Sequence, residues 1–350
     1  MKVAQVSPLV ESVPPKAYGG TERVVHYLTE ELVRQGHEVT LFASGDSQTS
    51  ARLRPVVPEA LRLASQPSDP MAWHLLQIAA VADSADAFDI VHFHTDFLHF
   101  PLWRRLNTPQ VTTMHGRLDL PHLWAIFSEF RDMPVISISD SQRAPLRMAQ
   151  WVSTIHNGVP SDVYDFQARP GDYLAFLGRI SPEKGIESAM DIAERAQLPL
   201  KIAAKVDPVD QAYFEQRIRR RLNHPLIEYV GEVDEQGKNA FLGGALAVLL
   251  PVAWPEPFGL VMIEAMACGT PVVAYRRGSI PEVMVDGQTG YIVSGLEEAV
   301  AAVGRIGAID RHACRRCFEN RFTSRRMAQD YLQVYSALIE VGHVARRAVN

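Results

Sequence analysis

Short β-rich runs alternate with helical patterns along almost the whole chain, and this alternation constrains the fold more than any other feature. In the first half, the strand-like runs are residues 2–7, 38–44, 89–94, 110–115 and 134–139. Between the first two runs, apolar residues recur at helical spacing from Val24 to Val33, and Gly36 supplies a C-terminal stop. Alternation of this kind builds βαβ units, so we predict an α/β fold with parallel strands and helices on both faces of the sheet.

The pattern starts again after residues 162–172, a polar stretch containing Pro170 and Gly171 that is typical of an interdomain linker. The strand-like runs of the second half are residues 173–178, 200–206, 227–232, 247–251 and 271–276. A chain of 350 residues is long enough for two such domains. We therefore expect two Rossmann-like, doubly wound domains, residues 1–165 and 166–325, facing each other across a cleft. Ligands of such sheets bind beyond the carboxyl ends of the strands.

Composition excludes several classes of protein. The chain is 47% hydrophobic and 21% charged, as globular proteins are, and contains no apolar run approaching the roughly 18 residues of a membrane-spanning helix. Its first residues read as a β-strand and not as a signal peptide. Three cysteines are too few for a disulfide framework, which indicates the cytoplasm. A formal net charge of −5 argues against a nucleic-acid partner.

One basic cluster stands out near the C-terminus. It consists of Arg311, Arg315, Arg316, Arg321, Arg325 and Arg326. A solvated helix face explains such a cluster, and a weak peripheral contact with an anionic membrane is the alternative.

Two loops that follow strands have features suited to an anion. Gly19 and Gly20 precede a helix, whose first N–H groups and positive dipole end attract negative charge. Their spacing matches neither of the standard phosphate-loop patterns, so a plain turn between strand and helix remains an alternative. In the second half, Arg179 and Lys184 flank a proline-containing turn. A bidentate guanidinium and a mobile ammonium suit a diphosphate, although two surface cations would give the same pattern.

Residues 251–293 are the densest stretch of the chain in candidate functional residues. Glu256 directly precedes a helix that we expect to begin at Gly259 or Leu260, and Glu264 lies eight residues further on. The helical rise separates the two carboxylates by roughly 10–12 Å. That is too far for a retaining glycosidase, which needs about 5 Å, but it brackets a ligand with two polyol ends. Alternatively Glu256 is a turn residue and Glu264 a buried carboxylate that needs a hydrogen-bonding partner, which a ribose diol would supply.

Here the sequence resembles a known family. The segment PEPFGLVMIEAMACGTPVVA, with Glu256 and Glu264 in a Glu-x7-Glu pattern, is similar almost residue for residue to the signature of the retaining glycosyltransferases of family 4, the group 1 glycosyl transferases. GRISPEKG at 178–185 resembles the phosphate loop of that family, YGGTERVVHYLTEELVRQGHEVTLF at 18–42 its first loop and helix, and NGV at 157–159 the segment before its linker. The similarity covers nearly the whole chain.

The resemblance implies a GT-B fold and a retaining enzyme that moves a sugar from a UDP-, GDP- or ADP-sugar to a hydroxyl acceptor. We expect no metal and no other cofactor, because the second half has no Asp-x-Asp at a strand end to hold a divalent ion, whereas Arg179 and Lys184 do stand at one. We assign no side-chain nucleophile. The resemblance also implies that residues 326–350 form a helix that returns to the first domain.

The resemblance further assigns roles to individual residues. Glu256 would bind hydroxyls of the donor sugar, near the backbone N–H groups of Phe258, Gly259 and Leu260, and Glu264 would hold the ribose. Arg179 and Lys184 would clamp the diphosphate, and Gly19 and Gly20 would close on it. His115 matches the histidine of the family that touches the donor sugar near its 6-hydroxyl. The implied catalytic set is His115, Arg179, Lys184 and Glu256.

Two other functions remain open. His92, His94 and Asp96 follow an apolar strand in a His-x-His-x-Asp pattern like that of metallohydrolases, although Phe97 stands where that pattern needs a further histidine. Cys314 and Cys317 lack the second pair that a zinc site needs. A nucleotide-sugar epimerase or binding protein would use the same diphosphate clamp without transferring the sugar.

Specificity is the part that the sequence leaves open. We expect the acceptor to contact loops 8–20, 44–70 and 95–130, where no pattern identifies it. We expect the base to contact the backbone around residues 230–232 and Val252, which does not separate uracil, guanine and adenine. The oligomeric state is equally open.

Overall fold

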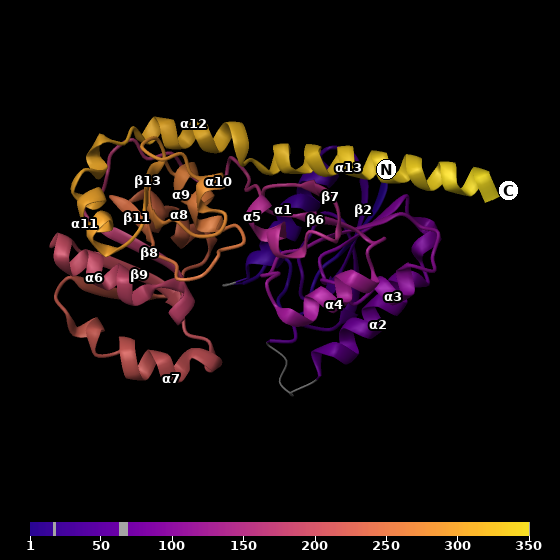
Figure 1. Cartoon of the computed structure of the whole chain (residues 1–350), viewed down its shortest axis with the longest axis horizontal. Helices are drawn as coiled ribbons and strands as arrows, with labels where there is room; N and C mark the ends of the chain where they lie inside the picture. The colour runs from indigo at the N-terminus through magenta and orange to yellow at the C-terminus, as the bar shows by residue number, and fades with distance from the viewer. Residues whose placement is uncertain (17–18, 63–68, 350) are drawn as a thin grey trace. The chain divides into compact units, whose positions relative to one another are not determined.

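The computed structural model describes residues 1–16, 19–62 and 69–349, with side chains up to residue 342 in the last stretch. The chain forms two compact units (Figure 1). Unit 1 contains Met1–Gly158 and Ser324–Asn350, and unit 2 contains Val159–Thr323. The chain thus passes between units at 158–159 and at 323–324, where the sequence suggested 165–166 and 325–326.

Unit 1 is built on a parallel sheet of seven strands in the order β3-β2-β1-β4-β5-β6-β7. The strands are β1 Lys2–Val6, β2 Glu38–Ser44, β3 Arg52–Val57, β4 Ile90–Phe93, β5 Gln110–Thr113, β6 Pro134–Ser137 and β7 Gln150–Thr154. This is the Rossmann strand order with one strand added at its far edge, and the order reverses between β1 and β4.

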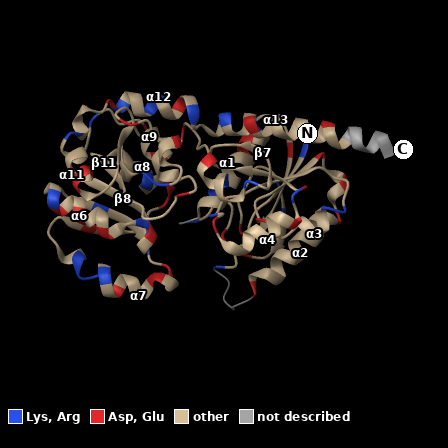
Figure 2. Ribbon diagram, viewed as in Figure 1, with Lys and Arg blue, Asp and Glu red and all other residues tan. Residues whose placement is uncertain are grey.

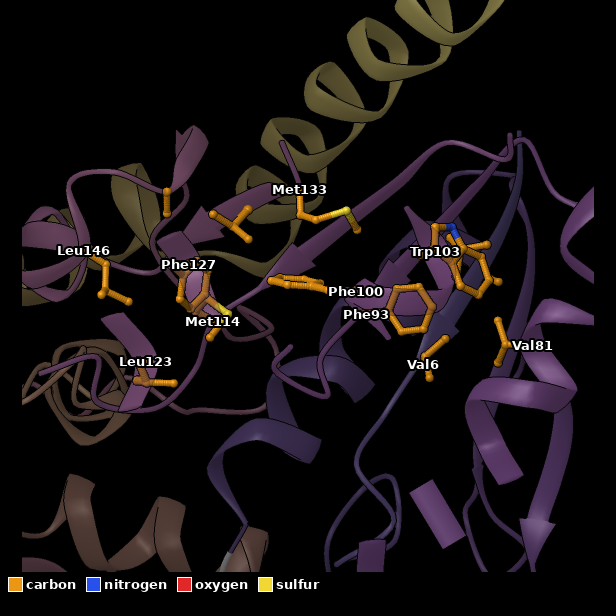
Figure 3. Packing of buried hydrophobic residues seen from close by; sticks show 14 of the residues in the cluster. Val6, Val81, Phe93, Phe100, Trp103, Met114, Leu123, Phe127, Met133 and Leu146 are labelled. Atoms are coloured by element: carbon orange, nitrogen blue, oxygen red, sulfur yellow. The ribbon is translucent and has the colours of Figure 1, made fainter. Parts of the chain in front are cut away.

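The helices of unit 1 bury an apolar core against this sheet. They are α1 Gly20–Arg34, α2 Pro70–Ala82, α3 Phe100–Trp103, α4 Pro121–Glu129, α5 Asp140–Arg143 and α13 Ser324–Val349, with short 3-10 turns at Ala85–Ala87 and Ala144–Leu146. Figure 3 shows Phe93 of β4 in one cluster with Phe100, Trp103 and Phe127 of the helices. The rings of Phe93 and Trp103 meet edge to face, with centroids 4.7 Å apart, a geometry that aromatic pairs prefer.

Helix α1 ends as its sequence predicts. The amide of Gly36 donates to Val33 O and that of His37 to Leu32 O, and Gly36 has a φ of 85°. These two bonds and the left-handed glycine form a Schellman motif, which satisfies the last carbonyls of the helix.

Unit 2 repeats the architecture on a parallel sheet of six strands in the order β10-β9-β8-β11-β12-β13. The strands are β8 Leu174–Arg179, β9 Leu200–Lys205, β10 Ile227–Gly231, β11 Ala247–Leu250, β12 Val272–Tyr275 and β13 Gly290–Val293. Counted from β8, this is again the Rossmann order 3-2-1-4-5-6, with its reversal between β8 and β11.

Helices and short turns connect the strands of unit 2. The helices are α6 Ile186–Ala196, α7 Gln211–Tyr213, α8 Glu235–Gly243, α9 Leu260–Ala267, α10 Ile280–Val283, α11 Leu296–Gly304 and α12 Arg311–Arg321. The 3-10 turns are Pro182–Lys184, Pro208–Asp210, Arg221–Asn223 and Ile306–Ala308, and Phe214–Ile218 is a short π-helix.

Three strands were not expected from the sequence, namely β3, β7 and β13. Each lies at an edge of its sheet. Because an edge strand is covered less completely than a central one, it does not need the continuous apolar run on which the sequence-based prediction depended.

Most members of the basic cluster do not form a solvated helix face, so that expectation was wrong for them. Arg311 is buried and donates to the carbonyls of Gln167, Ala245 and Gly243. Arg315 and Arg321 likewise donate to backbone carbonyls of unit 2, and Arg326 to those of His156 and Asn157. Figure 2 shows the basic residues along α12, where Glu319 is the acidic residue of the helix. These arginines therefore hydrogen-bond the backbone of the folded chain.

Within the part of the chain that the structure describes, no helix has the combination of length and apolar character needed to cross a membrane.

Candidate functional site

In unit 2, the loops that follow β8 and β11 contact each other at the point where the strand order reverses. A Cβ on Gly185 would lie 2.0 Å from the Pro251 carbonyl oxygen, and Gly185 has a φ of 74°, so only glycine permits this approach. The amide of Ala253 donates to Glu183 O at 2.9 Å and joins the two loops. The predicted loops GRISPEKG and PVAWPEPFG are therefore neighbours in space.

This contact brings Lys184 and Glu256 together. The Lys184 ammonium lies 2.7 Å from Glu256 Oε2, and Trp254 Nε1 donates to the same oxygen at 2.9 Å. The ammonium also lies 5.1 Å from the centre of the Trp254 indole ring, within cation–π range. The Glu256 side chain is only 9% exposed, so this ion pair is held at the edge of the interior. Two residues predicted separately, 72 positions apart, thus form one polar cluster.

The backbone after Glu256 is fixed from its other side. A Cβ on Gly278 would lie 2.3 Å from Glu256 O, and Ser279 donates from its amide to Glu256 O and from its hydroxyl to Phe258 O. Helix α9 then begins at Leu260, with Gly259 as its left-handed cap residue at a φ of 80°. This start confirms the expected one. Gly259 has no side chain to cap the helix, so no side-chain cap bonds the backbone N–H groups at the start of α9.

Glu264 is buried on α9 with two partners that the sequence did not reveal. Lys238 Nζ lies 2.8 Å from Glu264 Oε1, and the Tyr164 hydroxyl donates to the same oxygen at 3.1 Å. The buried carboxylate required a partner, as its apolar neighbours in the sequence indicated. Lys238 and Tyr164 lie 26 and 100 positions away, and no local pattern connects them to it.

Arg179, at the end of β8, is surrounded by carboxylates. It pairs with Glu183, with Asp210 at 3.2 Å and with Asp207 at 3.7 Å. Burial, together with the negative charges of Glu183 and Asp207, raises the pKa of Asp210 in spite of Arg179. Lys184 shares the loop with Arg179 but pairs with Glu256, so the two cations have separate partners in this structure.

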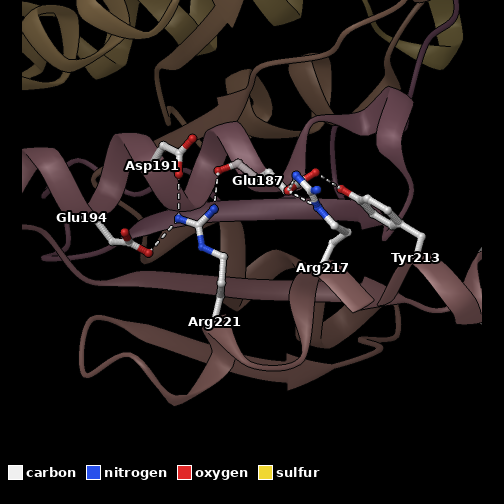
Figure 4. Close-up of polar contacts among 6 residues, drawn as sticks. All are labelled: Glu187, Asp191, Glu194, Tyr213, Arg217 and Arg221. Carbon is white, nitrogen blue, oxygen red and sulfur yellow. Dashed lines mark hydrogen bonds and ion pairs between the residues drawn. The ribbon is translucent and has the colours of Figure 1, made fainter. Parts of the chain in front are cut away.

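The segment that carries Asp207 and Asp210 is anchored on α6 by the contacts in Figure 4. Arg221 lies 2.7 Å from Asp191 and 2.8 Å from Glu194, while Arg217 and Tyr213 both reach Glu187. These contacts attach residues 213–221, which follow Asp207 and Asp210 in the chain, to α6.

In unit 1, His115 follows β5 and joins a chain of buried polar groups. Its Nε2 lies 2.8 Å from His94 Nδ1, and His94 Nε2 lies 2.8 Å from Gln5 Oε1. Burial lowers the pKa of His115 to about 4, and burial with two neighbouring imidazoles lowers that of His94 well below its usual range. Both rings are therefore neutral at physiological pH.

The same packing bears on the His-x-His-x-Asp pattern. His92 uses both ring nitrogens, 2.6 Å from the Tyr335 hydroxyl and 2.7 Å from Thr113 Oγ1, and both nitrogens of His94 are also hydrogen-bonded. Across residues 1–16, 19–62 and 69–349, no three His, Cys, Asp or Glu side chains form a group able to hold a metal ion. Burial raises the pKa of both Cys268 and Cys314 to about 12, so these thiols are packing residues.

Gly19 and Gly20 lie at the start of α1, at the same sheet edge as His115. A Cβ on Gly19 would lie 2.7 Å from Pro15 Cβ, so the loop packs tightly there. Residues 17–18 of this loop, and residues 63–68 of the expected acceptor loops, lie outside the described residues.

Glu22, one turn into α1, is a buried carboxyl that the sequence did not single out. Burial, reinforced by the negative charge of Glu11, raises its pKa from 4.5 to about 7. The folded state therefore holds a proton that the unfolded chain releases near pH 4.5, and the stability gained from this proton is lost as the pH rises through about 7.

We expect the unfolding free energy to fall by about 3 kcal/mol more in the wild type than in Glu22→Gln over this pH window. Urea titrations at several pH values measure this difference. Glu38→Gln, which removes an exposed carboxyl of the same unit, serves as the control. Parallel curves for the wild type and Glu22→Gln would contradict the assignment.

Comparison with known proteins agrees with this geometry. The family described as Glycosyltransferase Family 4 matches residues 18–163, and the family described as Glycosyl transferases group 1 matches residues 167–309. A glycogen synthase of Mycobacterium tuberculosis is 28% identical over 83% of both chains, and a phosphatidyl-myo-inositol mannosyltransferase of Mycobacterium leprae is 26% identical over 86% of both.

Solved structures share the fold along nearly the whole chain. AviGT4, a glycosyltransferase involved in avilamycin A biosynthesis, has a TM-score of 0.75 at 26% identity, covering 97% of this chain and 98% of its own. Sucrose-phosphate synthase from Thermosynechococcus elongatus has a TM-score of 0.80 at 22% identity, covering 97% and 99%. Both expected Rossmann-like folds and the expected family are thereby confirmed: the chain has the GT-B fold, belongs to the group 1 glycosyltransferases of family 4, and is a transferase enzyme.

Proposed function

We propose that this enzyme transfers a sugar from a nucleoside-diphosphate sugar to a hydroxyl acceptor with retention of anomeric configuration and without a metal ion. One observation carries the proposal: Lys184 and Glu256 form an ion pair where the loops after β8 and β11 meet. In Rossmann-like sheets this reversal point is where nucleotides bind.

The chemistry of the step explains why a cation and a carboxylate belong together there. When the glycosidic bond breaks, negative charge grows on the β-phosphate, and a preorganised cation stabilises it. Lys184 supplies this cation and Arg179 a second one. Glu256 binds sugar hydroxyls, and the N–H groups around Phe258, Gly259 and Leu260 lie beside it at the start of α9. Glu264 binds the ribose through its carboxylate, which Lys238 and Tyr164 hold in one position.

The ion pairs of Arg179 in unit 2 support metal independence. Glu183, Asp207 and Asp210 each pair with the Arg179 guanidinium, so these carboxylates already have a side-chain cation as their counter-charge. The three cysteines are buried free thiols, which supports a reducing, cytoplasmic compartment.

The proposed donor is a UDP-, GDP- or ADP-sugar, and these three differ in the base. One neighbour in fold, the Anabaena protein HepE, was solved in complex with UDP and glucose at 19% identity and a TM-score of 0.75. A starch synthase IV from Arabidopsis thaliana was solved with ADP and acarbose. A thermal-shift panel of the three nucleoside diphosphates decides among them, because ligand at 100 times its Kd stabilises a protein by about 2.7 kcal/mol.

Product analysis with the preferred donor tests the whole proposal. We expect a glycoside with the donor's anomeric configuration, one nucleoside diphosphate released per transfer, and the same rate with excess EDTA as without it. An isomerised donor would identify an epimerase, and tight binding without turnover a binding protein. A rate abolished by EDTA and restored by Mg²⁺ or Mn²⁺ would refute metal independence.

A further inference from the structure

Unit 1 contains a continuous chain of hydrogen-bonded side chains beneath His115. From the interior outward, it runs from Tyr335 to Gln5, then to His94, and ends at His115. The separations are 3.1 Å from Gln5 Nε2 to the Tyr335 hydroxyl, 2.8 Å from Gln5 Oε1 to His94 Nε2, and 2.8 Å from His94 Nδ1 to His115 Nε2. Tyr335 belongs to α13, 330 positions from Gln5 in the sequence.

Each link of the chain determines the direction of the next. The Gln5 amide donates from Nε2 to Tyr335, so its carbonyl oxygen is the atom that faces His94. A carbonyl oxygen only accepts, so His94 must carry its proton on Nε2. A neutral imidazole holds one N–H, which leaves His94 Nδ1 as an acceptor. The proton between the two rings therefore belongs to His115 Nε2.

This direction decides what His115 offers at its other nitrogen. With its proton on Nε2 and a neutral ring, His115 carries a lone pair on Nδ1. A nitrogen of this kind accepts a hydrogen bond from a hydroxyl and cannot donate one. Had the chain run in the opposite direction, Nδ1 would carry the proton and donate instead.

We propose that Tyr335, Gln5 and His94 are positioning residues that hold His115 as its Nε2–H tautomer, so that its Nδ1 accepts a hydrogen bond from a hydroxyl of the sugar substrate. The part concerning the sugar rests on the proposed function. The part concerning the proton does not, because it rests on the donation from Gln5 Nε2 to Tyr335 within unit 1.

The branch through Tyr335 agrees with this orientation of the Gln5 amide. The Tyr335 hydroxyl has one proton, and His92 Nδ1 lies 2.6 Å from its oxygen. While the hydroxyl accepts from Gln5 it donates to His92, which then donates from Nε2 to Thr113 Oγ1, 2.7 Å away. Tyr335 of the C-terminal helix is thus the interior end of a hydrogen-bonded chain that ends at His115, after β5.

Nuclear magnetic resonance of the full chain, labelled with ¹⁵N in histidine, tests the proton positions directly. A proton in an N–H···N bond couples strongly to the nitrogen that carries it and weakly to its acceptor. We expect strong coupling to His115 Nε2 and weak coupling to His94 Nδ1, with the His115 signals identified by their loss in His115→Gln. Strong coupling to His94 Nδ1, or no shared proton between these rings, would overturn the proposal.

Two tyrosine variants isolate the role of the C-terminal helix. In Tyr335→Phe the Gln5 amide loses the acceptor that orients it, and we expect the shared proton to be found on both histidines. Tyr331→Phe is the matched control, because Tyr331 lies one turn away and bonds to Thr113, not to Gln5. We expect the Tyr331→Phe spectrum to keep the proton on His115. If the proton also stays on His115 in Tyr335→Phe, Tyr335 does not set the direction of the hydrogen bond between His115 and His94.

Transfer activity tests the second half of the proposal. His94→Leu removes the acceptor for the His115 proton, and we expect kcat to fall about two- to tenfold at unchanged nucleoside-diphosphate affinity. His94→Asn can place a carbonyl oxygen near the original Nδ1 and should recover most of this loss. Equal rates for His94→Leu and His94→Asn would show that transfer does not depend on a hydrogen-bond acceptor for the His115 proton. A chain with the expected proton positions and no glycoside product would refute the proposed function and leave the tautomer assignment intact.

Discussion

Replacing Lys184 with alanine is expected to lower kcat about 10²- to 10³-fold, the loss seen when one preorganised contact to developing negative charge is removed. The ammonium lies 2.7 Å from Glu256 and against the Trp254 ring, so its position is set before any ligand arrives. Such a cation needs no reorganisation during the reaction, which is why its removal acts on kcat. Initial rates at saturating donor, with product quantified, measure the change.

Lys205→Ala is the matched control for this experiment. Lys205 ends the neighbouring strand β9, is 15% exposed and pairs with Asp207 at 2.9 Å, so it resembles Lys184 in burial and charge but lies outside the contact with Glu256. We expect its kcat to stay within a few-fold of the wild type. Comparable losses in the two variants would mean that general positive charge matters and that Lys184 has no particular role.

Arg179 is a less direct test of the same idea. Its removal would leave Glu183, Asp207 and Asp210 without their common cation, so Arg179→Ala changes the local charge as well as any contact with the diphosphate. Glu256→Gln is cleaner, because the amide retains an oxygen that Lys184 and Trp254 can reach. Its effect should be on kcat, since the sugar hydroxyls place the anomeric carbon.

Local patterns predicted the parts of the fold and site that depend on nearby residues. The central strands were recognised because both faces are buried and their apolar runs are continuous, whereas the edge strands β3, β7 and β13 were missed. The start of α9 after Gly259 and the stop of α1 at Gly36 were predicted because a left-handed glycine is a local signal. The sequence also placed Lys184 and Glu256 on loops after two strands, which a parallel sheet brings to one edge.

Contacts between distant residues had no such signal. Lys238 lies in α8 like any lysine of a helix, and only the packing of α8 against α9 shows that it neutralises Glu264. The arginines from Arg311 onward were interpreted as a charged surface. Their partners are backbone carbonyls, which every residue has, so no sequence pattern identifies them. In the sequence, Tyr335 is an aromatic residue of a C-terminal helix, and only the folded structure shows its contacts with Gln5 and His92.

Lys238→Met is expected to lower the unfolding free energy by about 3–5 kcal/mol, since it leaves the Glu264 carboxylate buried beside the Tyr164 hydroxyl without its cation. Both side chains of the pair are at most 10% exposed, so solvent screens the lost charge poorly. Urea denaturation measures the change. Lys201→Met is the control, because its pair with Glu228 is largely exposed and should contribute less than about 1 kcal/mol.

The buried pair also determines how the ribose role of Glu264 has to be tested. Glu264→Ala would strand the Lys238 ammonium in the interior, so a loss of nucleotide binding could come from misfolding alone. Lys238→Met combined with Glu264→Gln removes both charges and keeps an oxygen for Tyr164, and it should recover most of the stability that Lys238→Met loses. We expect this double variant to bind nucleoside diphosphate roughly 10- to 100-fold more weakly by calorimetry, as loss of a charged hydrogen bond to a diol predicts. Wild-type affinity in the stable double variant would show that Glu264 is a structural carboxylate and that the ribose is held elsewhere.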